Sequence, residues 1–349
     1  MTANKRLVVD LLNDLFLPGS TEVKFVLSPG VSMVSNAIVA HFHVKDKTNG
    51  DIQAMIKIAP DVGNSERLGG NLISQYLQIP LELEPHGDDF YLYHRIRGCT
   101  VDQLVRNKGH RLAGSEHYLN SVLQHMTMWE RTVSMNSKVV GYVPKVEATI
   151  EKIKQYTLLQ NPIKSLLGRR VIINGVELPS IEDSLDKMQQ VISSSQVSVM
   201  SHGDEGACNV VINREENNQL YYIDHGTAGQ RIIEEPLAKI LLWFPATLSE
   251  KLRFDVNIKQ HELIIDYNIG VDSYVKGMVN EAKTMIVGKL GNKIDATLLQ
   301  ACIMMYLFRE MQWIGRRGRE LMLAPLFAMA MEAAGVMWGA LEEASFLAA

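Results

Sequence analysis

The sequence predicts an α+β fold in which a small antiparallel sheet precedes a larger, mainly helical region. Between Glu22 and Ile58 three segments alternate apolar and polar residues, as strands with one buried face do. Beyond Thr100 most apolar residues recur at the three- and four-residue spacing of helices. A chain of 349 residues is long enough to form two packed lobes.

Composition and charge exclude several classes of protein. The chain is 46% hydrophobic and 21% charged, which is typical of globular proteins, and its formal charge of −4 gives no general attraction for nucleic acid. Three cysteines without paired spacing fit a reducing cytoplasm. The apolar stretch 321–338 contains Pro325 and Glu332, which favours a buried helix over a membrane span. We therefore expect no nucleic-acid or membrane partner, and the oligomeric state stays open.

The N-terminal elements follow in order. Residues 1–20 predict a short amphipathic helix, and the turn Lys47–Gly50 predicts a hairpin between the second and third strands, because Asn-Gly accepts the positive φ angles of a tight turn. Residues Ser28–Ser32 are expected to form the loop between the first two strands. Further elements are expected in this order: a helix over Ser65–Gln78 and short strands over Leu81–Leu83 and Phe90–Tyr93.

The rest of the chain is expected to be helical with two β exceptions. The exceptions are Arg170–Glu177, which contains an Asn-Gly turn, and a hairpin over Asn209–Ile223. The expected helices are Val101–Asn107, Glu116–Met135, Ile181–Ser194, Val271–Leu290 and a longer run over Thr297–Trp338. We divide the chain into the helix 1–20, a sheet-containing lobe 21–94 and a helical lobe 95–349.

The most informative motif surrounds the second hairpin. His202-Gly203-Asp204 is followed after four residues by Asn209, and Asp224 closes the hairpin. This pattern resembles the phosphotransfer core of the aminoglycoside phosphotransferase and choline kinase family, a branch of the protein-kinase-like superfamily. Its four identities alone should occur by chance in roughly one chain of this length in a thousand. Ordinary turn residues are the alternative, but other elements fall in the order that the family shows.

The resemblance covers about residues 28–238 and implies a bilobal protein-kinase-like fold, with a small antiparallel-sheet N-lobe and a large mainly helical C-lobe. It implies ATP or GTP as phosphate donor, with Asp204 as the catalytic base, because a carboxylate can accept the proton of the attacking hydroxyl. It also implies that Asn209 and Asp224 hold Mg²⁺, a cation that prefers oxygen ligands.

Lys57 lies in the third strand, where the resemblance matches it to the lysine that contacts nucleotide phosphates; a solvent-facing lysine is the alternative. Its expected glutamate partner is less clear. Glu66 follows after only nine residues and is our candidate, whereas a more usual spacing falls near Asn71. Both stay open as partners of Lys57.

The remaining nucleotide contacts come from two segments. The resemblance makes Tyr93, His94 and Ile96 part of the hinge that binds the base, although an edge strand ending in a turn would give the same pattern. Gly30 and Ser32 are expected to cover the phosphates, in a loop that lacks the usual run of glycines.

Two classes of function remain open. The first is an ATP- or GTP-dependent kinase whose partner is a small-molecule hydroxyl acceptor, such as an antibiotic, amino sugar, nucleoside or choline-like metabolite. The second is a kinase-fold nucleotide-binding scaffold, or an enzyme that transfers a group other than phosphate. A base together with two metal ligands favours the first, and the short stretch Gly226–Glu235 disfavours a protein substrate. The acceptor pocket is expected after Ala238, with these candidate contacts: Glu332, Glu342, Glu343, Arg316, Arg317 and Arg319.

Overall fold

The computed structural model divides the chain into two compact units, which we describe separately. Unit 1 comprises residues 1–104, 202–204 and 208–229, and unit 2 comprises 105–201, 205–207 and 230–349. The structure describes residues 3–15, 22–31, 37–46, 50–83, 87–106, 146–158, 161–195, 199–248, 251–270, 273–290, 294–316, 322–345 and 347. The expected helix Glu116–Met135 and the tip of the first hairpin, 47–49, lie outside these residues, and the lobe boundaries at 20 and 94 stay a prediction.

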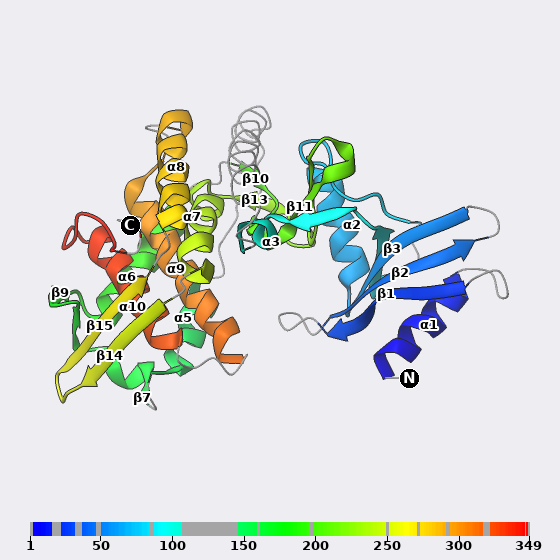
Figure 1. Cartoon of the computed structure of the whole chain (residues 1–349). Helices are drawn as coiled ribbons and strands as arrows, with labels where there is room; N and C mark the ends of the chain where they lie inside the picture. The colour runs from blue at the N-terminus through cyan, green and yellow to red at the C-terminus, as the bar shows by residue number, and fades with distance from the viewer. Residues whose placement is uncertain are drawn as a thin grey trace. The chain divides into compact units, whose positions relative to one another are not determined.

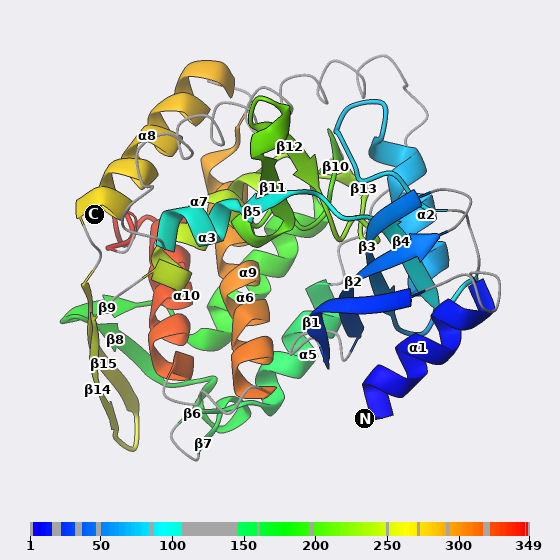
Figure 2. The ribbon, with the colours of Figure 1, turned by 45° about the vertical axis from the view of Figure 1, so that its right-hand side comes forward.

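Unit 1 is built on a four-stranded antiparallel sheet in the order β1-β2-β3-β4. Figure 1 labels its first three strands, and Figure 2 labels β4 as well. The elements around this sheet are α1 (Ala3–Leu15), β1 (Glu22–Val31), β2 (Ile38–Asp46), β3 (Gly50–Ile58), α2 (Val62–Ile73) and β4 (Phe90–His94). Helix α1 covers one face of the sheet, where Val8 and Leu12 pack in a core with Phe42, Ile56 and Leu92. The opposite face of β3 therefore presents Met55 and Lys57, because side chains alternate along a strand. The predicted meander of three strands is confirmed.

The prediction that Ser28–Ser32 form a loop is wrong for most of this segment. Strand β1 continues to Val31, and Gly30 pairs with Val39 across two irregularities of register, between Phe25 and Leu27 and between Leu27 and Gly30. A strand that carries such bulges tolerates the Pro29-Gly30 pair, which in the sequence is typical of a turn. Ser32 lies outside the described residues.

Helix α2 begins three residues before the expected Ser65 and ends at Ile73, five residues before the expected Gln78. Its buried face includes Val62, Glu66, Gly69 and Ile73, so the two glycines that weaken its middle lie against other parts of the unit. The expected strand at Leu81–Leu83 is reduced to a single bridge between Glu82 and Tyr93.

A second sheet in unit 1 carries the motif residues. It has the order β12-β11-β5, with β5 (Gly98–Thr100), β11 (Val210–Asn213) and β12 (Gln219–Tyr222), and α3 (Val101–Arg106) follows β5. The hairpin β11–β12 confirms the prediction for Asn209–Ile223. Asn217 and Asn218 adopt positive φ angles of 51° and 60° at its turn, which asparagine accepts more readily than most residues.

Unit 2 is mainly helical (Figure 2). Helix α9 (Ala296–Arg316) packs against α5, α6, α7 and α10. The helices besides α9 are α5 (Val146–Gln155), α6 (Ile181–Ser193), α7 (Glu234–Leu248), α8 (Ser273–Leu290) and α10 (Leu323–Met337). The short strands are β6 (Thr157–Leu158), β7 (Asn161–Pro162), β10 (Val199–Ser201) and β13 (Gly229–Arg231). Within the described ranges, no helix has both the length and the apolar character needed to cross a membrane.

Unit 2 also contains a sheet that the sequence only partly predicts. Strands β8 (Arg170–Ile173) and β9 (Val176–Leu178) form the expected Asn-Gly hairpin, but β14 (Lys251–Ile258) and β15 (Glu262–Gly270) lie where we expected no strand. Strand β15 pairs in parallel with β8, about ninety residues earlier in the chain. Strands β14 and β15 themselves form a local hairpin around residues 259–261, with alternating apolar residues on both sides. The expectation of only two β segments after Thr100 missed this pattern and is wrong.

Candidate active site

Lys57 lies between two carboxylates on the face of the sheet opposite α1. Its Nζ atom is 2.9 Å from Oε1 of Glu66 and 2.5 Å from Oδ1 of Asp224. The three residues come from β3, from α2 and from the end of the β11–β12 hairpin. The structure thus brings together one predicted phosphate-binding residue, its expected partner and one predicted metal ligand.

Glu66 and Asn71 lie on different faces of α2, and this decides which of them pairs with Lys57. Glu66 is on the buried face of α2 with 2% of its side chain exposed, whereas Asn71 is exposed. The second carboxylate oxygen of Glu66 accepts a hydrogen bond of 3.0 Å from the backbone N–H of His225. Glu66 therefore connects β3 to the segment 224–226, and Asn71 is not the partner of Lys57.

The electrostatics of this cluster are those of one cation shared by two acids. Burial raises the pKa of Glu66 to about 7, although Lys57 opposes the shift. Burial also acts to raise the pKa of Asp224, but the Lys57 ammonium outweighs it, so that this pKa is lowered. Burial would lower the pKa of Lys57, yet Asp224 and Glu66 together raise it. Asp224 therefore keeps its charge near neutral pH, and Glu66 is the group that takes up a proton first.

Asp224 adopts a left-handed backbone conformation, with φ at 62°. This conformation is costly for a residue other than glycine and persists where surrounding contacts enforce it, often at functional sites. The side chain of Asp224 is 49% exposed although one of its oxygens contacts Lys57. The exposed part of this carboxylate is therefore accessible to a ligand.

His225 is buried against α2. A Cβ atom added to Gly69 would lie 1.9 Å from the carbonyl oxygen of His225, and one added to Gly70 would lie 3.2 Å from its Nε2 atom. The ring of Tyr91 meets the imidazole edge to face, with 5.6 Å between ring centroids. Burial lowers the pKa of His225 to about 4, so the imidazole is neutral at pH 7. The Gly69-Gly70 pair thus lets the helix approach the segment that carries Asp224.

Asp204 and Asn209 form a second pair within unit 1. The amide nitrogen of Asn209 donates to the backbone oxygen of Asp204 at 3.0 Å and to its carboxylate Oδ2 at 2.7 Å. The backbone oxygen of Asn209 accepts from the N–H of Ile223 at 2.9 Å, next to Asp224. Because the Asn209 amide nitrogen is occupied, its amide oxygen is the atom suited to a metal ion. No three acidic, histidine or cysteine side chains of the described ranges cluster as a metal site by themselves.

The expected hinge follows β4. The phenol of Tyr93 donates to the sulfur of Met55 at 3.1 Å, on the same face of the sheet as Lys57. The backbone N–H of His94 donates to Leu81, and that of Arg95 donates to Gln53. These bonds fix the end of β4 and leave the segment from Ile96 onward to turn away from the sheet. The strand and its end are as expected, and base binding by Tyr93, His94 and Ile96 stays a prediction.

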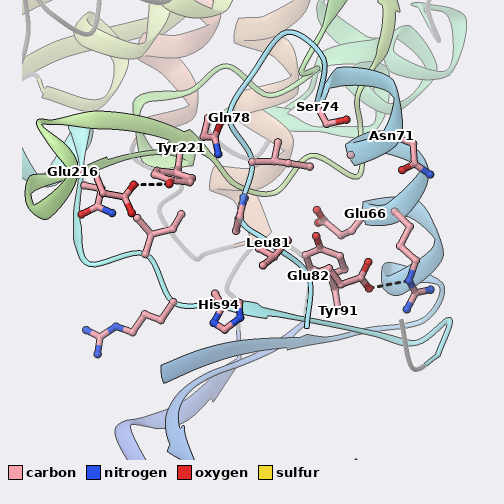
Figure 3. Close-up of a pocket in the computed structure, with 17 residues that line it drawn as sticks. Glu66, Asn71, Ser74, Gln78, Leu81, Glu82, Tyr91, His94, Glu216 and Tyr221 are labelled. Carbon is pink, nitrogen blue, oxygen red and sulfur yellow. Dashed lines mark hydrogen bonds and ion pairs between the residues drawn. The ribbon is translucent and has the colours of Figure 1, made fainter. Parts of the chain in front are cut away.

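A pocket of about 640 Å³ lies beside α2, and we call it the α2 pocket (Figure 3). Figure 3 shows Glu66, Asn71 and Ser74 along one side of it and Glu216 and Tyr221 on the other. Its lining comes from α2, residues 78–82, the end of β4 and the tip of the β11–β12 hairpin, all within unit 1. No local residue pattern indicates it, because it combines residues 66–96 with the β11–β12 hairpin much later in the chain.

One expectation for the acceptor pocket is wrong. Glu332 of α10 is buried, and its carboxylate accepts from the backbone N–H and the hydroxyl of Ser345, at 2.7 and 2.9 Å. A carboxylate satisfied in this way holds the C-terminal segment and does not face a ligand. Glu343 contacts Lys283 at 2.5 Å. The side chains of Arg316, Arg317 and Arg319 lie outside the described residues.

Comparison with known proteins supports the fold. No protein-family model and no curated protein matches the sequence. Among solved structures, an ethanolamine kinase from Plasmodium vivax is 10% identical, with a TM-score of 0.53, over 97% of this chain and 89% of that one. A choline/ethanolamine kinase family protein from Mesorhizobium loti is 10% identical over 95% and 99% of the two chains, with a TM-score of 0.49. An aminoglycoside phosphotransferase from Streptomyces rimosus is 13% identical over 93% and 99%, with a TM-score of 0.48.

The chain therefore has an α+β protein-kinase-like fold, as the sequence predicted. Within that fold, the solved structures that it resembles carry the names of kinases and phosphotransferases of small molecules.

Proposed function

We propose that this protein is an ATP- or GTP-dependent phosphotransferase that moves the γ-phosphate to a hydroxyl group of a small molecule. One observation carries the proposal. The Lys57 ammonium lies 2.9 Å from the Glu66 carboxylate and 2.5 Å from that of Asp224, although the three residues come from three separate elements. A lysine held by a buried glutamate suits contact with nucleotide phosphates, and an exposed carboxylate beside it suits a metal ion.

Each of the other site residues has a role in this proposal. Asp204 would accept the proton of the acceptor hydroxyl, since its carboxylate is oriented by the amide nitrogen of Asn209. Tyr93, His94 and Ile96 would bind the base, and the backbone near Gly30, with Ser32, would cover the phosphates. The N-lobe would comprise residues 21–94 and the C-lobe residues 95–349.

The amide oxygen of Asn209 and the part-exposed carboxylate of Asp224 fit Mg²⁺, which prefers such oxygen ligands and takes the rest from water and phosphate. Magnesium would neutralise charge that develops on the transferred phosphate. Lys57 would keep Asp224 ionised for this purpose, because its ammonium lowers the pKa of that carboxyl.

The proposed acceptor is a small molecule such as an antibiotic, an amino sugar, a nucleoside or a choline-like metabolite, and not a nucleic acid. The proposed location is the cytoplasm, where the free cysteines Cys99, Cys208 and Cys302 would stay reduced. Helices α8, α9 and α10 of unit 2 follow Ala238 and would enclose the acceptor.

Calorimetry with MgATP and MgGTP, followed by transfer of labelled γ-phosphate to a panel of small hydroxyl compounds, tests the proposal. We expect micromolar to millimolar nucleotide binding that needs Mg²⁺, and labelling of one chemical class in the panel. Binding without any transfer would favour a scaffold or an enzyme that transfers another group. Absence of binding at millimolar nucleotide would refute the proposal.

A further inference from the structure

We propose that the outer edge of strand β14 in unit 2 is an interaction surface for a second copy of this chain, whose own β14 pairs with it in antiparallel fashion about a two-fold axis at Phe254. In the resulting dimer the two sheets join edge to edge. The proposal concerns unit 2 alone and does not depend on phosphotransfer.

Strand β14 is a long, regular edge strand. Its sheet has the order β14-β15-β8-β9, and Figure 1 shows β14 and β15 as one long hairpin. The eight residues Lys251–Ile258 all pair with β15 in one continuous register, and no proline or glycine interrupts them. Every second residue therefore turns its backbone N–H and C=O away from β15, and no strand of the described residues pairs with that edge. Such an edge is a template for another strand.

The apolar side of β14 is only partly covered. Phe254, Val256 and Ile258 are half-buried. Their partners across the ladder on β15 are buried, namely Tyr267, Ile265 and Leu263. A further strand beyond β14 would cover these side chains, because neighbouring strands pack their side chains against each other on each face of a sheet. The occupant should therefore alternate apolar and polar residues, as β14 itself does.

The polar side of β14 carries two charges that the rest of the described chain does not pair. Arg253 and Asp255 are exposed, and neither makes an ion pair or a side-chain hydrogen bond with another described residue. Asp255 also lies directly opposite Asp266 of β15, and like charges in that position repel. The occupant should therefore place a basic side chain beside Asp255 and an acidic one beside Arg253.

A second copy of β14 meets both requirements when the two-fold axis passes through Phe254. Arg253 of each copy then lies opposite Asp255 of the other, the two Phe254 rings lie opposite each other, and residues 251–257 pair. An axis at Arg253 or at Asp255 would place two like charges opposite each other. An axis between two residues would set apolar side chains against polar ones. The charges thus favour a second copy and select its register.

Charge reversal with rescue tests the proposal on the full chain. Arg253→Asp places two acids opposite each other at both ends of the contact, and Asp255→Arg places two bases there. An equimolar mixture of the two variants restores opposite charges at both places. The matched control is Asp186→Arg in α6, because Asp186 is also an exposed acid without a partner among the described residues.

Sedimentation velocity measures the dissociation constant of each sample. A single strand pair is a small contact, so we expect a reversible parent dimer with a dissociation constant of about 1–100 µM, and the same value for the control. Each reversal variant alone should raise this constant at least about tenfold, and the mixture should return to within about threefold of the parent.

Three results of this experiment would overturn the proposal. They are a parent that stays monomeric at about 200 µM, a reversal variant that dimerises as the parent does, and a mixture that stays monomeric. Failure of the proposed function would appear separately, in the nucleotide assays, and would leave these results unchanged.

Hydrogen exchange of the parent provides a second test that needs no variant. Exchange in residues 251–257 should slow several-fold when the protein concentration rises from about 1 to 200 µM, because the outward N–H groups become bonded in the dimer. Strand β9 at the opposite edge of the same sheet is the internal control and should not change. Equal exchange of β14 at the two concentrations would contradict the pairing.

Discussion

Gly69 of α2 lies so close to the carbonyl oxygen of His225 that a Cβ atom on it would be 1.9 Å from that oxygen. Two nonbonded atoms cannot approach to this distance. A side chain at position 69 would therefore force the helix and the segment 224–226 apart. The same helix carries Glu66 and the same segment carries Asp224, which both contact Lys57.

Gly69→Ala should therefore destabilise the protein, although alanine is usually better than glycine in a helix by about 1 kcal/mol. We expect a loss of at least about 2 kcal/mol in the free energy of unfolding, measured with urea. Gly288→Ala in α8 is the matched control, because nothing lies within 4 Å of its added Cβ. That variant should be neutral or slightly stabilised, and equal stabilities of the two variants would contradict the close approach.

Substitutions of the two acids of the proposed centre, Asp204 and Asp224, should affect different steps. Asp204→Asn should leave nucleotide affinity nearly unchanged and lower turnover roughly 10²–10⁴-fold, the usual cost of losing a general base. Asp224→Asn should weaken the binding of the Mg²⁺-nucleotide itself, because Asp224 offers a part-exposed carboxylate beside Lys57. Calorimetry and steady-state kinetics on both variants distinguish the roles, and full activity in Asp204→Asn would argue against its role as base.

Glu66 should make stability depend on pH. Its pKa rises from 4.5 to about 7 on folding, so the folded chain binds more protons than the unfolded chain between these values. The free energy of unfolding should therefore fall as pH rises from 4.5 to 7, by up to about 3 kcal/mol. Glu66→Gln should flatten this part of the profile in urea unfolding without Mg²⁺. An unchanged slope in the variant would assign the dependence to another group.

Lys239 of α7 should destabilise unit 2 near neutral pH. Burial lowers its pKa to about 8, so the unfolded chain binds the extra proton between pH 8 and 10.5, and stability should rise over that range. Lys239→Met should be more stable than the parent at pH 7, by at most about 3 kcal/mol, and the difference should shrink toward pH 10.5. Thermal unfolding at several pH values measures this, and a less stable variant at pH 7 would contradict it.

The sequence by itself determined the α+β fold class, the first meander, the β11–β12 hairpin and the motif residues. Each of these depends on neighbours in the chain: alternation within a strand, asparagine and glycine at a turn, or a motif of fixed spacing. Lys57 was placed on the third strand, and Asp204, Asn209 and Asp224 were placed around the hairpin, for the same reason. The resemblance then supplied the roles that remain proposals.

Only the tertiary structure decided which residues meet. Glu66 follows Lys57 more closely than expected and Asn71 is nearer the usual spacing, so the choice between them depends on which face of α2 is buried. Strand β15 pairs with β8 across about ninety residues, and the α2 pocket combines residues 66–96 with the distant β11–β12 hairpin. The physical reason is that packing, burial and long-range pairing depend on how elements are placed against one another, which local residue patterns do not encode.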